Sequence, residues 1–193
     1  MPHYPSLFCA ISLGLLSLAA KADTELLVSV PDQKLVLLQN GVRVGEFPVS
    51  TSRFGIGDRP RSYATPLGAM QVESKIGDRA QEGAVFHSRR LTGEVIRPNA
   101  PGRDPIVTRI LCLRGLEPQN ANASSRGIYI HGTPQERMIG RPASFGCIRM
   151  RSRDVVKVFE ATPVGAKVEI VNLPVSKAMK ETASSDKATA PTS

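Results

Sequence analysis

The stretch IHGTPQERMIGRPASFGCIRM, residues Ile130–Met150, decides how this chain is interpreted, because it joins an extended run to a glycine-rich turn. It places His131 and Cys147 sixteen positions apart in a chain that has only three histidines and three cysteines. Each of the two lies beside a glycine, Gly132 and Gly146. Glycine lets a backbone approach a substrate closely. The stretch therefore predicts a site built on one histidine and one cysteine.

This pair predicts nucleophilic catalysis. A free cysteine is mostly protonated at neutral pH, so Cys147 needs a base, and His131 can take its proton and later return it to a leaving amine. The carbonyl of Gly132 can hold the second imidazole nitrogen. The backbone amides of Phe145, Gly146 and Cys147 can converge on a developing oxyanion. From the residues alone, we infer a cysteine hydrolase or acyltransferase.

Arg149 lies two residues after the cysteine. Its guanidinium offers a bidentate fork for a substrate carboxylate, and its charge favours the Cys147 thiolate. A competing interpretation is an internal ion pair that supports the turn. If Arg149 binds substrate, Arg149→Lys should impair catalysis more than stability, and if the arginine is structural, both should fall together.

Cysteine and histidine could also form a zinc site or a disulfide. Zinc sites use spacings such as CxxC or HxxxH, and neither occurs, so no metal is predicted. A disulfide between Cys112 and Cys147 is open to an exported protein, but Cys112 lies in the strand-like run IVTRILCLRGL. We therefore expect Cys112 to be a small buried hydrophobe and both thiols to be free. His87, with no glycine or cysteine neighbour, is predicted to be structural or exposed.

The first 22 residues are predicted to be a signal peptide, with an apolar run and AKA before Asp23. The rival interpretation is a retained membrane anchor. The protein is thus expected to be exported, to the periplasm or the cell wall. The net charge of +8 then indicates anionic envelope polymers, lipid head groups or a carboxylate-rich substrate as partners, and no nucleic acid. Aromatic residues are 5% of the chain and Trp is absent, so stacking surfaces should be scarce.

The rest of the chain predicts one mostly-β, sandwich-like domain over residues 23–173. Long loops are expected at Ser52–Pro66 and Gly93–Pro105 and are candidate lids. One helix is predicted over Ser152–Ala161, with Ser152 as its cap and Asp154 in its first turn. Residues 174–193 are predicted to be a disordered tail. The expected strands are Glu25–Val30, Lys34–Gln39, a return strand after Asn40–Gly41, Ala69–Ser74, Gly83–Ser88, Ile106–Leu116, Gly127–Gly132 and Ala166–Val171.

The motif His131-Gly132-Thr133, followed by Ser144-Phe145-Gly146-Cys147-Ile148-Arg149-Met150, resembles the signature of the L,D-transpeptidases with the YkuD-type catalytic domain. The likeness extends to KLVLLQNGVRVGEFPVSTS and ATPLGAMQV and covers roughly residues 25–172. One departure is Phe145, where several members carry a second histidine. The resemblance implies a YkuD-like β-sandwich of mixed sheets, with one short helix after the cysteine motif.

The resemblance also implies a reaction. Cys147 is expected to attack the L-centre carbonyl of diaminopimelate in a peptidoglycan tetrapeptide stem, releasing D-Ala and forming a thioester. Ser144 and Arg149 are expected to bind substrate or support the motif, and no cofactor is implied. The acyl acceptor stays open among a second stem, which gives a 3–3 cross-link, an envelope lipoprotein, a free D-amino acid and water. A hydrolase or carboxypeptidase at the same site, and a non-catalytic envelope-binding domain, are the alternatives.

Overall fold

The structure is a computed structural model that describes residues 23–181. The predicted signal peptide lies outside the described residues, so its prediction stands untested. Within residues 23–181, no helix has the length and apolar character needed to cross a membrane.

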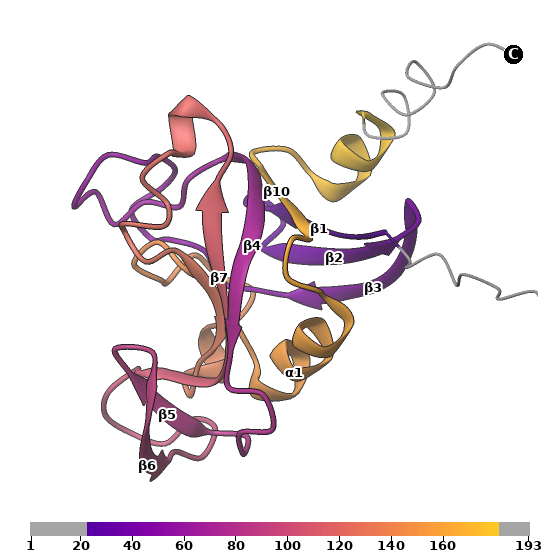
Figure 1. The fold of residues 1–193 in the computed structure, drawn as a ribbon. Helices are drawn as coiled ribbons and strands as arrows, with labels where there is room; N and C mark the ends of the chain where they lie inside the picture. Colours follow the sequence, from indigo (N-terminus) through magenta and orange to yellow (C-terminus); the bar gives the residue numbers. More distant parts are fainter. Residues whose placement is uncertain (1–22, 182–193) are drawn as a thin grey trace, which may run out of the picture.

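Ten strands form a mixed sheet, which confirms the mostly-β prediction (Figure 1). The path of neighbours is β3-β2-β1-β10-β4-β7-β5-β6, and β8 and β9 branch from β7. Only the pairs β1–β10 and β8–β9 are parallel. The strands are β1 (Thr24–Ser29), β2 (Lys34–Gln39), β3 (Val42–Pro48), β4 (Gly68–Ile76), β5 (Ala84–His87), β6 (Arg90–Val95), β7 (Ile106–Gly115), β8 (Tyr129–Gly132), β9 (Ile148–Met150) and β10 (Lys167–Val171).

The central strand β7 explains the branching. Its ten residues are long enough to pair with β4 and β5 and also with β8. The chain after β3 closes the fold, because Ser50 forms an antiparallel bridge with Arg149 of β9. The predicted sandwich is therefore one hydrogen-bonded network that curls upon itself. The main core lies inside it. Seven strands, β1, β2, β4, β7, β8, β9 and β10, contribute buried residues to this core, and the exposed β6 contributes none.

The helix α1 (Ser152–Ala161) follows β9 and packs on β7 and β8. Its bounds agree with the prediction, and Val155, Val158 and Phe159 are buried as expected. The predicted cap is wrong, because Arg151 is the N-cap and Ser152 is the first helical residue. The Ser152 hydroxyl is instead buried at 2.7 Å from the Thr108 hydroxyl. Two short 3-10 helices, η1 (Pro118–Asn120) and η2 (Glu136–Met138), lie in the loops.

The structure also corrects the C-terminal boundary. Residues 175–181 are helical, so the described part of the chain has two α-helices and not one. Val175 and Ala178 are buried against Leu27, Val36 and Leu38 on the outer side of β1 and β2. The disordered tail predicted from residue 174 is therefore wrong for residues 174–181, and its remainder lies outside the described residues. The start of the predicted loop Gly93–Pro105 belongs to β6.

Candidate active site

The strand pair β8–β9 brings the two halves of the motif together. The pair is parallel, with His131 opposite Arg149 and Ile130 opposite Ile148. Cys147 directly precedes β9, two residues before Arg149, so the pairing brings the cysteine beside the strand that carries His131.

The imidazole of His131 is fixed as a base. Its Nδ1 lies 2.8 Å from the carbonyl oxygen of Gly132, so Nδ1 carries the proton and Nε2 can accept one. Burial lowers the pKa of His131 to about 4, against smaller opposing effects of the Gly132 carbonyl and Asp104. The ring is therefore neutral at pH 7.

Gly132 cannot be replaced without moving a backbone. A Cβ at this position would lie 2.5 Å from the carbonyl oxygen of Val107 on the neighbouring strand β7. The glycine therefore allows the close approach that holds its own carbonyl at the imidazole.

The thiol of Cys147 is partly exposed and protonated. Its Sγ lies 3.3 Å from the carbonyl oxygen of Gly127, to which it donates. Burial raises the pKa of Cys147 to about 11, although the Tyr129 backbone amide, Arg126 and Arg149 each lower it. Arg149 thus lowers the pKa of Cys147, as predicted, but burial raises this pKa by more. The resting site is thus a neutral thiol beside a neutral imidazole.

Ser144 supports the turn that carries the cysteine. Its hydroxyl donates to the Cys147 carbonyl at 2.6 Å and accepts from the Gly146 amide at 3.2 Å. One of the three amides predicted for the oxyanion hole is therefore already occupied. Among residues 23–181, no acceptor contacts the amides of Phe145 or Cys147, so these two stay available.

Arg149 is turned inward. Only 4% of the residue is exposed, and its guanidinium pairs with Asp104 and donates to the Ser50 hydroxyl at 3.2 Å. Asp104 also accepts a hydrogen bond from the Thr133 hydroxyl. This favours the internal ion pair over the substrate-binding role. The sequence holds no signal for the role of Asp104, since no spacing links its loop to the motif.

Within residues 23–181, Cys112 and Cys147 are both free, as predicted. Cys112 is 2% exposed and lies on β7 opposite Tyr129 of β8. The strand β8 therefore lies between Cys112 and Cys147, which directly precedes β9. Adjacent strands lie about 4.8 Å apart, so two strand spacings exceed the ~7 Å limit for bridged Cα atoms. A disulfide between Cys112 and Cys147 would need backbone movement.

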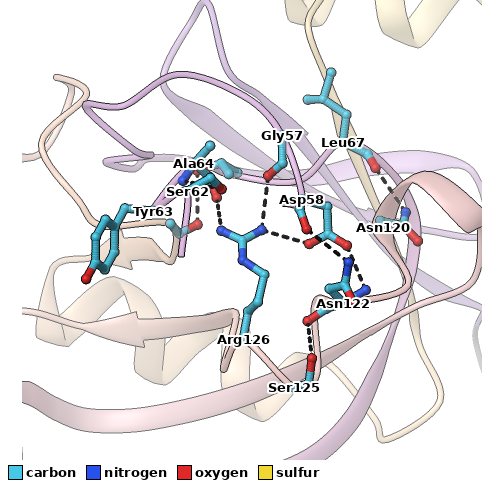
Figure 2. Close-up of polar contacts among 12 residues, drawn as sticks. Gly57, Asp58, Ser62, Tyr63, Ala64, Leu67, Asn120, Asn122, Ser125 and Arg126 are labelled. Atoms are coloured by element: carbon cyan, nitrogen blue, oxygen red, sulfur yellow. Dashed lines mark hydrogen bonds and ion pairs between the residues drawn. The ribbon is translucent and has the colours of Figure 1, made fainter. Parts of the chain in front are cut away.

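A buried ion pair borders the site (Figure 2). Arg126, next to the carbonyl-bearing Gly127, lies 2.7 Å from the Asp58 carboxylate. The same guanidinium donates to the carbonyl oxygens of Gly57 and Ala64, at 3.0 and 2.7 Å. The loop of residues 52–66 is thereby held against the strand that leads to His131. Its proposed action as a lid stays a prediction.

No group of three or more metal-ligating side chains occurs within residues 23–181. His87 is exposed at the end of β5 and no hydrogen bond connects it with the motif.

Comparison with known proteins agrees with this arrangement. The model of the YkuD L,D-transpeptidase catalytic domain matches residues 23–170. The chain is 40% identical over 131 residues to the probable L,D-transpeptidase ErfK/SrfK of Salmonella typhimurium, covering 60% of this chain and 42% of that protein. It is 43% identical over 54 residues to the putative L,D-transpeptidase YqjB of Bacillus subtilis, or 28% and 31% of the two chains. The matches span less than half the length of these relatives.

Solved structures share the fold. L,D-transpeptidase 3 from Mycobacterium tuberculosis has a TM-score of 0.52 at 20% identity, covering 78% of this chain and 61% of that one. The L,D-transpeptidase LdtMt1 in complex with imipenem has a TM-score of 0.50 at 22% identity, covering 78% and 59%. At these identities the likeness shows the fold alone.

Proposed function

The chain belongs to the family of YkuD L,D-transpeptidase catalytic domains, and on that premise we propose that it is a cysteine acyltransferase acting on peptidoglycan tetrapeptide stems. One observation carries the proposal: the contact of His131 Nδ1 with the Gly132 carbonyl leaves Nε2 free, and the β8–β9 pairing brings Cys147 beside the strand of this imidazole. We further propose that the protein works outside the cytoplasm, where such stems occur.

The first half-reaction forms a thioester. Nε2 of His131 takes the thiol proton while Sγ of Cys147 attacks the carbonyl carbon at the L-centre of the third stem residue. The amides of Phe145 and Cys147 donate to the oxyanion. The bond to D-Ala then breaks, and the leaving nitrogen takes the proton from His131. Free D-Ala leaves, and the enzyme is acylated.

The second half-reaction transfers the acyl group. An acceptor amine attacks the thioester carbonyl, His131 takes a proton from that amine, and the sulfur leaves and recovers the proton. A second stem gives a 3–3 cross-link, while a lipoprotein lysine or a D-amino acid gives another amide. Water as acceptor gives net hydrolysis.

The protonation states support proton transfer during attack and not before it. A thiol of pKa about 11 and an imidazole of pKa about 4 do not form an ion pair at rest. General-base catalysis removes the proton as the carbon–sulfur bond forms, so no free thiolate has to build up. Arg126 and Arg149 favour the charge that develops on sulfur.

The test is intact mass spectrometry of the purified protein after incubation with a tetrapeptide stem, or with a carbapenem such as imipenem. We expect one adduct per chain, with release of D-Ala from the stem. The variant Cys147→Ala should give none, while Cys112→Ala should still be acylated. An adduct on folded Cys147→Ala, or none on the unmodified protein with either probe, would refute the proposal.

A further inference from the structure

Three aromatic side chains gather on the surface of a chain that is poor in them. Phe54, Tyr63 and Phe145 are 49%, 54% and 57% exposed, and each contacts the other two. Their ring centroids are 5.4–5.8 Å apart. We call these three residues the aromatic rim. The rim contradicts the expectation that stacking surfaces would be scarce, and its exposure means that it is not part of the core.

The aromatic rim adjoins the nucleophile. Phe145 lies two residues before Cys147, and the other two rings belong to the loop of residues 52–66. Thr65 ties this loop to the catalytic turn by donating to the Gly146 carbonyl at 3.0 Å. Ser52 donates to the Tyr63 carbonyl at 2.5 Å. A ligand on the rim would therefore lie next to the reacting thiol.

The rim is held in place before any ligand binds. The Arg126–Asp58 pair fixes the base of the loop, with side chains only 9% and 5% exposed. Figure 2 shows the Tyr63 ring pointing away from this pair. Asn122 adds a second tie, because its backbone amide donates to the Asp58 carboxylate at 2.6 Å. A preorganised surface spends less binding energy on ordering itself.

The rim also carries positive charge and a hollow. The Arg53 guanidinium lies 4.4 Å from the centre of the Phe145 ring. A hollow of about 300 Å³ opens between Pro60, Arg61, Tyr63, Ser125, Arg126 and Phe145. Within residues 23–181, neither Arg53 nor Arg61 has an acidic partner. Flat apolar faces beside unpaired guanidinium groups suit a ligand that has both an apolar face and carboxylates.

We propose that the aromatic rim binds the glycan end of the donor strand, with an N-acetylated pyranose ring against the aromatic faces. A pyranose presents C–H bonds on one face, and their slight positive charge and dispersion contacts suit an aromatic surface. Arg53 and Arg61 take the free carboxylate of the stem between sugar and thiol. The hollow lies at the small end of the range of ligand sites.

Chain length agrees with this assignment, which rests on the proposed function. An extended peptide spans about 3.3–3.6 Å per residue, so three stem residues place the sugar about 10 Å from the attacked carbonyl. Phe145 lies two residues from Cys147, at most about 7 Å along the chain, and the centres of the Phe145 and Phe54 rings are 5.4 Å apart. The rim thus covers the distance at which the sugar would lie.

The first test compares substrates with and without sugar. The double variant Phe54→Ala/Tyr63→Ala should raise KM at least tenfold for a disaccharide-tetrapeptide, and leave kcat/KM for the sugar-free tetrapeptide and the rate of acylation by imipenem unchanged. The matched control is Leu91→Ala/Val164→Ala, which removes two residues that are 58% and 59% exposed elsewhere. Equal losses on both substrates would overturn the proposal, as would no loss on either.

The second test does not depend on turnover. Cys147→Ala is titrated with peptide-free oligomers of the alternating N-acetylated disaccharide, and binding is followed by NMR of the Phe145 ring protons, which the double variant retains. We expect saturable shifts that the double variant abolishes. If these shifts occur but no acylation does, the proposed reaction fails and the glycan site stands. If acylation occurs and the Phe145 ring does not respond, the glycan site is refuted, and a protein partner becomes the occupant to examine.

Discussion

Arg149 and Asp104, 45 positions apart in the chain, form an ion pair, and Arg149 lies opposite His131 on the neighbouring strand. The arginine side chain is 5% exposed and the aspartate side chain 23%. The guanidinium also reaches Ser50, whose backbone bridges β9 at the closing edge of the sheet. The pair therefore joins three separate segments at the site: the loop before β7, the chain after β3 and the cysteine strand.

Removing the aspartate should destabilise the fold. Asp104→Ala leaves the Arg149 charge buried without its partner, and breaking a buried pair in this way costs about 3–5 kcal/mol. Arg103→Ala, next in the chain, breaks an exposed pair with Glu94 and should cost under about 1 kcal/mol. Urea unfolding of the two variants measures the difference. If Asp104→Ala unfolds like Arg103→Ala while its activity falls, the aspartate acts on the reaction and not on the fold.

Truncation after residue 173 should also reduce stability. It removes Val175 and Ala178 from the cluster on Leu27, Val36 and Leu38. Burial of one valine contributes about 1.5–3 kcal/mol, so we expect a loss of about 2 kcal/mol in urea unfolding. Truncation after residue 181 keeps this cluster and serves as the control. Equal stability of the two truncated chains would show that the helical segment contributes nothing.

Stability should depend on pH through His131. The unfolded side chain binds a proton near its ordinary pKa of 6.5, while burial holds the folded pKa at about 4. The unfolded state therefore binds more protons between these values, and stability falls as the pH drops from 6.5 toward 4. The contribution is about 3 kcal/mol at pH 4, at 1.36 kcal/mol per pH unit.

His131→Gln should remove this part of the acid destabilisation. The quantity compared is the change in unfolding free energy between pH 7 and pH 4.5, because the substitution also alters stability at neutral pH. His87→Gln, at an exposed position, should keep the pH dependence of the unmodified protein. An unchanged dependence in His131→Gln would mean that the imidazole is not buried in its neutral form.

Residue patterns within single segments predicted most of the strands and the helix α1. They could not predict contacts between residues that lie far apart in the sequence. The bounds of α1 and β2 follow from apolar periodicity within each segment. The strand β6 was missed because all six of its residues are exposed, so no buried face marks it. The second helix had a usable signal, since Val175, Ala178 and Met179 have helical spacing, but its polar surroundings concealed it.

The same distinction between local patterns and remote contacts holds for the candidate site. His131, Gly132, Ser144 and Cys147 were found because they share one stretch of sequence. The partner of Arg149 comes from a loop that folds back from 45 positions earlier, and no sequence spacing encodes that contact. The aromatic rim likewise needs the loop of residues 52–66 to meet Phe145 in space.

The last prediction concerns the reactivity of Cys147. With a pKa of about 11, the thiol should react with iodoacetamide about tenfold faster for each pH unit between 6.5 and 9. A resting thiolate–imidazolium pair would instead react at a nearly constant rate across this range. Labelling should stay below pH 9, because an unfolded cysteine ionises near 9 and the folded one near 11, so stability is lost as the pH rises through this interval.

Cys112→Ala and Cys147→Ala separate the two thiols in this experiment. Both variants are made in a Cys9→Ser background, because the chain has a third cysteine at position 9. Cys112 is 2% exposed, so Cys147→Ala should be labelled only on unfolding. Cys112→Ala should reproduce the full pH dependence of the unmodified protein. Mass spectrometry of quenched samples gives the rate at each pH. A rate that levels off below pH 8 in folded Cys112→Ala would contradict the neutral resting pair and would mean that the thiol is activated before substrate arrives.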